Sequence, residues 1–247
     1  MASDGPPTND DSRYEDHEPL LGQPGDQAQE KDKPMPYNLI TGTAILSQAG
    51  ILILAATVFA AVFTHAFIWP FSMHPLLNSV AALFAFEAAL ILQPTHTPAQ
   101  KRIGALIHGS LNGLAFLLYL LAFVAIYYNK SAHGGVHFES IHAIMGLTTY
   151  IVLLIQAAVG FTMYFVPSLY GSVDKAKSIW KYHRMSGYLV LTLALATVCA
   201  ATTTDYNQNV LGMELWVMIV ASVLVLLGLI PRVKLQKFGL KTGSHRF

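Results

Sequence analysis

The sequence contains little charge and a single cysteine. Only 12% of its 247 residues are Asp, Glu, Lys or Arg, whereas 53% are hydrophobic, and the mean hydropathy is +0.46. A water-soluble domain carries about twice that share of charged residues, so the balance excludes this class and predicts an integral membrane protein. Cys199 has no second cysteine with which to form an intrachain disulfide or a CxxC redox motif.

Acidic residues are scarce outside the first 37 residues, which hold nine of the fourteen Asp and Glu. Because almost nothing apolar accompanies them, 1–37 is predicted to be a disordered tail. No basic stretch followed by a short apolar core opens the chain, so we expect the first spanning segment to direct targeting. The stretch DHEPLL at 16–21 fits an acidic dileucine pattern, which makes a vacuolar, lysosomal or endosomal membrane one hypothesis for the location.

Residues 38–231 are predicted to form the transmembrane domain. They contain six apolar stretches, each near the ~20 residues that cross a hydrocarbon core. The stretches are 39–68, 72–92, 103–128, 138–166, 180–203 and 210–230. Short separators with Pro and Gly make sequential helices antiparallel neighbours. We therefore predict an all-α membrane protein of six transmembrane helices, followed by a basic tail at 232–247.

The distribution of Lys and Arg predicts the orientation in the membrane. These residues lie in both tails, between the second and third stretches, and between the fourth and fifth, whereas Lys130 alone falls on the other side. Cytoplasmic loops concentrate Lys and Arg, so both termini are predicted to be cytosolic. The second and fourth helices then start from the non-cytoplasmic face, and the third and fifth start from the cytosol.

Four histidines lie near the predicted starts of the second to fifth helices: His74, His108, His142 and His183. The alternating direction of these helices puts His74 and His142 at one depth, and His108 and His183 at another. A single intramembrane histidine is often only hydrogen-bonded to a neighbouring helix. Four that match in depth by pairs favour a binding function.

The ligand of these pairs is predicted to be a porphyrin and not a bare metal ion. Metal sites built from side chains alone usually combine His with Asp, Glu or Cys. Glu87 is the only obvious carboxylate well inside the second to fifth helices, and it lies ~20 Å along its helix from His74. Two facing imidazoles in an apolar bundle fit a flat macrocycle between them.

The residues one helical turn after the histidines are small. They are Asn78, Asn112, Gly146 and Gly187, and they share a helix face with the histidines. Small side chains leave room for a macrocycle, although close packing of membrane helices favours them too.

Three motifs and one spacing resemble the cytochrome b561 family of six-helix, two-haem electron carriers. The motifs are HPLL at 74–77, SIHAIMGL at 140–147 and YHRMSGYL at 182–189, and 34 residues separate both His74 from His108 and His108 from His142. The resemblance implies two haem b, one on His74 and His142 and the other on His108 and His183, held in a four-helix core of the second to fifth helices. The depth argument leads to the same pairs.

The resemblance also implies a transmembrane oxidoreductase. Two imidazoles per iron leave no open coordination position, which favours electron transfer over oxygen chemistry. In the family the cytosolic donor is ascorbate, and the acceptor on the other side is monodehydroascorbate or a ferric chelate. The ascorbate-associated pattern ALLVYRV is absent, because this chain has ALILQPTHTPAQKR at 89–102. The sequence is similar to a shorter subgroup that lacks this arginine.

Candidate donor and acceptor sites lie at opposite ends. Basic residues near the cytosolic face could attract an anionic donor, or could instead orient the protein and pair with haem propionates or lipid phosphates. They are Lys101, Lys177, Lys181 and Arg184, of which the last three form a stripe at i, i+4 and i+7. His133 and His137 could dock ferric iron on the acceptor side, with a solvated loop as the alternative.

Two other functions stay open at this point. A metal or proton transporter would use intramembrane histidines as relays, although such proteins usually carry more intramembrane carboxylates and broken helices. A haem-free scaffold would be colourless. The expected partners are membrane lipid and a small-molecule donor and acceptor, with no nucleic acid; a homodimer is a further hypothesis.

Overall fold

The computed structural model describes residues 27–30, 33–234 and 238. Within these residues it is helical, without strands, and six helices are long and apolar enough to span a membrane. They are α1 (Ala44–Phe63), α2 (Met73–Leu92), α3 (Pro98–Ala132), α4 (Ile141–Phe165), α5 (Val173–Ala201) and α6 (Leu215–Leu229), the last of which reaches the required length together with the short helix that continues it to Arg232. The predicted six-helix, multi-pass membrane fold is confirmed. The dileucine stretch at 16–21 lies outside the described residues.

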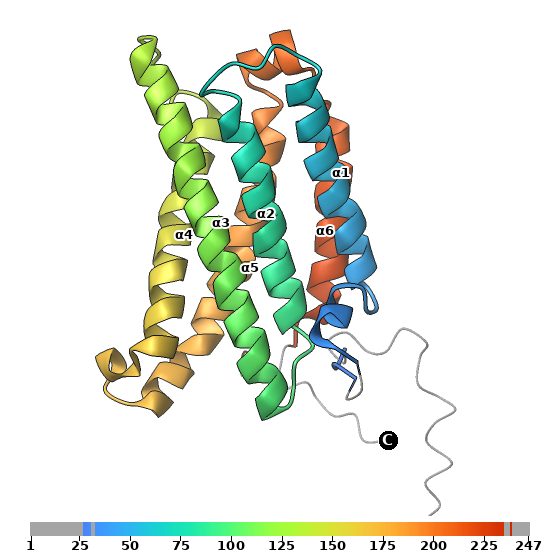
Figure 1. The fold of residues 1–247 in the computed structure, drawn as a ribbon, viewed down its shortest axis with the longest axis vertical. Coiled ribbons are helices and arrows are strands. Elements are labelled where there is room, and N and C mark those ends of the chain that lie inside the picture. The colour runs from blue at the N-terminus through green and yellow to red at the C-terminus, as the bar shows by residue number, and fades with distance from the viewer. Residues whose placement is uncertain (1–26, 31–32, 235–237, 239–247) are drawn as a thin grey trace, which may run out of the picture.

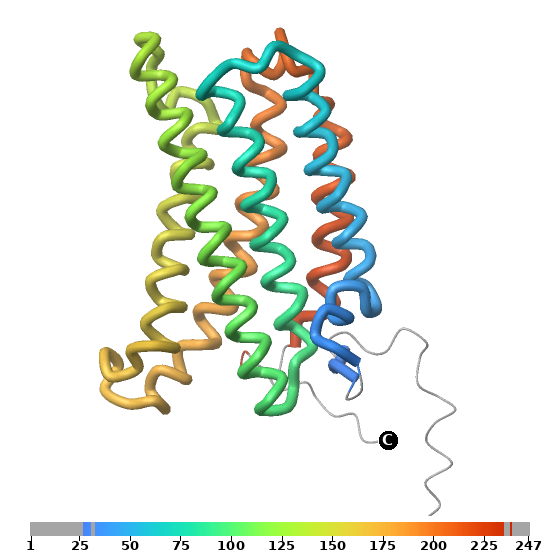
Figure 2. The backbone as a smooth tube through the Cα atoms, viewed as in Figure 1, coloured from blue at the N-terminus to red at the C-terminus, as the bar shows by residue number. Residues whose placement is uncertain are grey.

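The helices form an up-and-down bundle in which α1 and α6 lie side by side at one edge, as Figure 1 shows. Helix α2 connects this edge to α3, α4 and α5, and the tube in Figure 2 follows these alternating directions. Short helices lie at the bundle's ends: η2 (Met35–Leu39), η3 (Pro167–Tyr170), η4 (Asn207–Leu211) and η5 (Ile230–Arg232).

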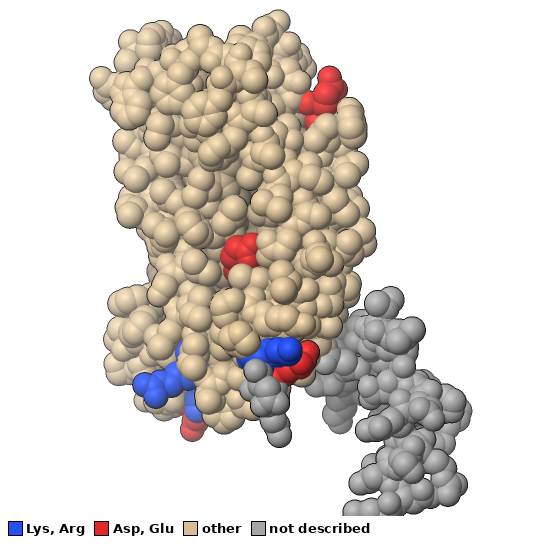
Figure 3. Space-filling model, turned by 45° about the vertical axis from the view of Figure 1, so that its right-hand side comes forward, with Lys and Arg blue, Asp and Glu red and all other residues tan. Residues whose placement is uncertain are grey.

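Lys and Arg gather at one end of the bundle. We call the end with the α2–α3 and α4–α5 connections the basic end, and the end with the other three connections the opposite end. On the face of the molecule that Figure 3 shows, the exposed Lys and Arg side chains lie at the basic end. Among the described residues, Lys130 near the end of α3 is the one Lys or Arg at the opposite end.

Close backbone approach joins α1 to α6. A Cβ on Gly50 would clash with the carbonyl oxygen of Ala221, and Ser47 Oγ donates to Val225 O at 2.8 Å. Small residues at such contacts let membrane helices pack by van der Waals contact and interhelical hydrogen bonds. Buried residues make up 39% of the spanning window in α1 but only 6% in α4. The α3–α4–α5 half therefore has fewer contacts among its own side chains.

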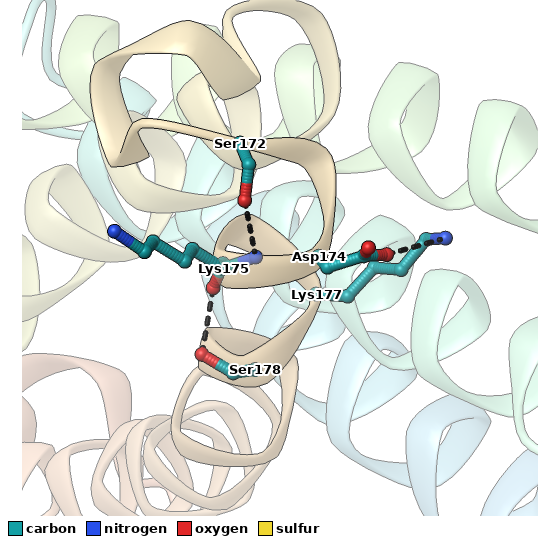
Figure 4. A network of polar contacts seen from close by, with 5 residues as sticks. All are labelled: Ser172, Asp174, Lys175, Lys177 and Ser178. Atoms are coloured by element: carbon teal, nitrogen blue, oxygen red, sulfur yellow. Dashed lines mark hydrogen bonds and ion pairs between the residues drawn. The ribbon is translucent and has the colours of Figure 1, made fainter.

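Helices α3 and α5 are longer than the predicted stretches 103–128 and 180–203, because polar caps start them earlier. Thr97 and Gln100 form a capping box around Pro98, the first residue of α3. Ser172 accepts from the Lys175 backbone N–H at 3.2 Å at the start of α5 (Figure 4). His108 and His183 therefore lie ten residues inside their helices, and the prediction that they lie near helix starts is wrong.

Residues just outside both predicted domain boundaries contact the bundle. In the predicted N-terminal tail, the Gln29 backbone N–H donates to Pro94 O at 3.0 Å, and Gln29 is 7% exposed. In the predicted basic tail, Arg232 is 1% exposed and donates to Asn38 O at 2.8 Å. These polar groups donate to backbone carbonyls near the end of the bundle. A hydropathy profile cannot predict such hydrogen bonds.

Candidate haem-binding site

The four intramembrane histidines form two facing pairs. The rings of His74 on α2 and His142 on α4 have centroids 6.1 Å apart at an interplanar angle of 86°. The rings of His108 on α3 and His183 on α5 have centroids 6.5 Å apart at 83°. The structure thus brings the histidines together in the predicted pairs, with the His74–His142 pair nearer the opposite end.

Hydrogen bonds from Nδ1 hold three of the four rings. His74 donates to Ala122 O at 3.1 Å, His108 to Ala88 O at 2.8 Å, and His142 to Thr197 O at 2.9 Å. A carbonyl only accepts, so each bond requires the proton on Nδ1 and leaves Nε2 with a free lone pair. This is the tautomer that a metal-binding imidazole needs, with its other nitrogen held by a backbone acceptor.

The ring of His183 is held differently. Its Nδ1 lies 2.8 Å from the side-chain amide of Gln156 on α4. A Cβ on Gly160, one turn further along α4, would lie 3.0 Å from His183 Cε1, so this position is restricted to glycine or to a shifted imidazole. Neither residue was predicted. Their signal in the sequence is that Gln156 is polar in an apolar helix and that Gly160 shares its face.

One spacing relates the two pairs. Each core helix carries a histidine of one pair and, 14 residues later, the group that holds a histidine of the other pair. The steps run from 74 to 88, 108 to 122, 142 to 156 and 183 to 197. Fourteen residues are almost four helical turns, so both positions face the same side, about 21 Å apart along the axis.

Both pairs fit the axial ligands of a haem. A metal–imidazole bond is about 2 Å, and the ring centroid lies about 1 Å beyond the nitrogen, so two imidazoles on one iron have centroids about 6 Å apart. The observed separations are 6.1 and 6.5 Å. Among the described residues, no group of three or more His, Cys, Asp or Glu could hold a metal ion. The donor set therefore suits iron that is already bound in a macrocycle.

The small residues beside the histidines have different surroundings. Asn78 and Asn112 donate back to the carbonyl oxygens of His74 and His108, at 2.7 and 2.9 Å. A Cβ on Gly187 would meet no atom within 4 Å, whereas one on Gly146 would touch Thr197 Cγ2 at 3.7 Å. The surface of α5 is thus open at Gly187, whereas Gly146 packs against α5.

The proposed donor residues lie at the basic end, and three of them contact local partners. Lys177 pairs with Asp174 at 3.5 Å, as Figure 4 shows, and Lys181 Nζ lies 4.9 Å from the ring centroid of its neighbour Tyr182. The Arg184 guanidinium lies 5.9 Å from the Phe238 ring. Local partners on α5 and at the C-terminal end therefore orient these side chains. Lys101 is exposed in the first turn of α3.

The proposed acceptor histidines do not share a helix. Helix α3 ends at Ala132, and Gly134 has a φ of +65°, which turns the chain away. His133 Nδ1 lies 2.7 Å from Asn129 O, whereas the His137 ring stacks on Tyr127 with centroids 4.4 Å apart. The i, i+4 spacing of the two histidines therefore does not place them on one helix face.

Glu87 lies apart from both pairs. Its Oε2 accepts from Gln48 Nε2 on α1 at 2.9 Å. A relay in which this carboxyl exchanges protons or metal with the histidines would require a contact that the described residues do not show.

Comparison with known proteins agrees with this architecture. A family model described as eukaryotic cytochrome b561 matches residues 73–208, which is more than half of the chain and includes all four histidines. A transmembrane ascorbate-dependent reductase CYB561 homolog of Caenorhabditis elegans is 26% identical over 196 residues, covering 72% of each chain.

Two further relatives are matched over about half of their lengths. The plasma membrane ascorbate-dependent reductase CYBRD1 of Mus musculus is 27% identical over 135 residues, which are 54% of this chain and 46% of that protein. The transmembrane ascorbate ferrireductase 2 of Arabidopsis thaliana is 29% identical over 127 residues, which are 51% and 54% of the two chains.

The fold and these relatives define the class as a multi-pass membrane protein related to ascorbate-dependent reductases and electron transporters. The chain belongs to the eukaryotic cytochrome b561 family. Membership implies haem and confirms the resemblance found in the three motifs. The shorter subgroup stays a prediction.

Proposed function

We propose that the protein transfers electrons across the membrane through two haem b, one held by His74 and His142 and the other by His108 and His183. The observation that carries the proposal is that each pair of imidazoles faces across about the distance that one iron requires. With two such pairs about 21 Å apart along a core about 30 Å thick, each half of the membrane would hold one redox centre.

The residues around the pairs suit electron transfer. A haem with two imidazole ligands exchanges one electron reversibly and has no open iron position. The Nδ1 hydrogen bonds fix the rings, so that little reorganisation accompanies a change of charge. Tyr150, which lies between His142 and Gln156 along α4, contacts Tyr119 and Phe123 with ring centroids 5.9 and 5.4 Å apart.

The charge distribution supports a direction. Lys and Arg concentrate at the basic end, which the positive-inside rule assigns to the cytosol together with both termini. An ascorbate-like anion would be attracted there by Lys101, Lys177, Lys181 and Arg184. Each ascorbate would release one electron and one proton to become monodehydroascorbate.

The acceptor would take the electron at the opposite end, near His133 and His137. A ferric chelate would become ferrous there, or a second monodehydroascorbate would gain one electron and one proton. The names of the matched relatives support a donor and an acceptor of these classes.

The decisive experiment is a reduced-minus-oxidised spectrum of the purified full-length protein with a haem assay. We expect a b-type α band and two haems per chain. Vesicles loaded with ascorbate should then reduce an impermeant external ferric chelate. A colourless protein would overturn the proposal, and metal uptake by such a protein would favour the transporter instead.

A further inference from the structure

The side chain of Gln156 occupies a position that backbone carbonyls fill elsewhere. In the 14-residue steps, Ala88, Ala122 and Thr197 each present a main-chain oxygen to Nδ1 of a histidine on a neighbouring helix. At the fourth position Gln156 presents its terminal amide to His183, 2.8 Å away. His183 is thus the one ligand whose partner depends on the identity of a side chain.

The orientation of this amide is coupled to the tautomer of His183. If Nε2 binds iron, Nδ1 carries the proton and must donate, so the amide oxygen must face it. The amide nitrogen then donates to Ser186 Oγ, which itself donates to Tyr182 O at 2.7 Å. The reversed amide donates to Nδ1 and to His183 O, at 2.8 and 3.3 Å, and its oxygen accepts from the Gly187 backbone N–H at 3.2 Å, so it satisfies its neighbours when the proton is on Nε2. Iron binding would therefore have to select the first arrangement over this one. Only the first arrangement leaves Nε2 free for iron.

We propose that Gln156 is a positioning residue that sets the redox potential of the haem on the His108–His183 pair, and of that haem alone. The inference rests on the proposed function, because it requires that His183 binds iron. A stronger acceptor at Nδ1 makes the imidazole more basic, which stabilises ferric iron and lowers the potential. A missing acceptor has the reverse effect and loosens the ring.

The His74–His142 pair provides the internal control. Its Nδ1 groups donate to the main chain of Ala122 and Thr197, which substitution of those side chains leaves in place. A control variant on the same helix as Gln156 is available at Thr148, which is exposed and whose hydroxyl donates to Ile144 O within α4 at 2.9 Å. Thr148→Val therefore alters α4 without changing a group that holds a histidine.

Potentiometric titration of the holoprotein tests the proposal, with optical spectra and electron paramagnetic resonance to distinguish the two haems. Gln156→Glu should lower one of the two midpoint potentials, and Gln156→Leu should raise the same one. Ser186→Ala, which frees the amide, should shift that midpoint less. In each of these variants the low-spin ferric signal of one haem should change, whereas Thr148→Val should change neither midpoint.

The outcomes distinguish a failure of the proposed role of Gln156 from a failure of the proposed function. Loss of only the His108–His183 haem in Gln156→Leu, with both haems kept in Gln156→Glu, also supports a positioning role. Unchanged midpoints in variants with two haems, or equal shifts of both, would overturn the role of Gln156 while leaving the proposed function intact. A wild-type protein without haem would instead overturn the proposed function.

Discussion

The two histidine pairs are similar in geometry but differ in what holds them. His74 and His142 lie one residue after the starts of α2 and α4, and both donate to main-chain carbonyls. His108 and His183 lie ten residues inside α3 and α5, and His183 is held by the side chain of Gln156.

The difference shows which parts of a repeated site respond to mutation. Main-chain acceptors are present whatever the side chain, so the His74–His142 pair keeps its tautomers through most substitutions nearby. The His108–His183 pair depends on Gln156 and on the missing side chain of Gly160. Two sites of the same chemistry can therefore acquire different potentials, which a directional electron path can use.

Replacement of the ligands should have the largest effect and tests the pairing itself. His74→Leu and His142→Leu should remove the same haem, whereas His108→Leu and His183→Leu should remove the other, because loss of one axial ligand leaves the iron unsatisfied. Redox titration and difference spectra of the four variants should therefore fall into two groups, each with about half of the wild-type haem.

Electron transfer by the four variants should fall into the same two groups. The His74 and His142 variants should retain a haem that a donor at the basic end reduces, yet should not pass electrons to the opposite side. The His108 and His183 variants should lose fast reduction by that donor. A His142→Leu spectrum that matches His108→Leu and differs from His74→Leu would contradict the transmembrane arrangement.

Crowding at Gly160 should affect one pair only. In Gly160→Leu the new Cβ would lie 3.0 Å from His183 Cε1, and the remaining side chain would displace the imidazole from its partner. We expect loss of most of the His108–His183 haem and a stability decrease of about 1–3 kcal/mol, measured by haem assay and thermal unfolding. A Cβ at Gly113 meets nothing within 4 Å, so Gly113→Ala is the matched control. Equal loss of both haems in Gly160→Leu would refute this assignment.

The fold and the pairing could be predicted from the sequence because they depend on patterns that extend over many residues. Six apolar stretches determine the number of helices, and alternating direction places histidines of alternate helices at equal depth. Helix ends were predicted less well, since caps such as Thr97 and Ser172 extend α3 and α5 beyond the apolar stretches.

The groups that hold the histidines could not be predicted in the same way. Three of them are main-chain carbonyls, which every residue has, and only the packing of two helices selects the carbonyl that contacts a ring. The side-chain contacts of Lys177, Lys181 and Arg184 could not be predicted for a related reason, and their common stripe stays a prediction. Helical spacing gives a common face, but long charged side chains bend toward local partners such as Asp174 and Tyr182.

A membrane potential should sharpen the comparison, because the electron crosses most of the field between the two pairs. A step of about 21 Å in a core about 30 Å thick corresponds to about 1.6 kcal/mol per 100 mV. Ferric chelate reduction by ascorbate-loaded vesicles should accelerate, by up to about 15-fold, when the donor side is made 100 mV more negative. An ionophore that clamps the potential at zero serves as the control. A slower rate would mean that the orientation is reversed.

The smallest change in midpoint potential should come from Tyr150→Phe, and it should appear at the His74–His142 pair. The Tyr150 hydroxyl donates to Asn78 Oδ1 at 2.9 Å, and Asn78 in turn donates to His74 O at 2.7 Å. Removal of the hydroxyl leaves Asn78 Oδ1 without this donor, at a cost of about 1 kcal/mol. The midpoint of the His74–His142 haem should shift slightly, while the His108–His183 haem stays unchanged. Tyr164→Phe, at a side chain that is 40% exposed, is the matched control. A midpoint shift confined to the His108–His183 haem would contradict this prediction, because the hydrogen bonds from Tyr150 through Asn78 lead to His74.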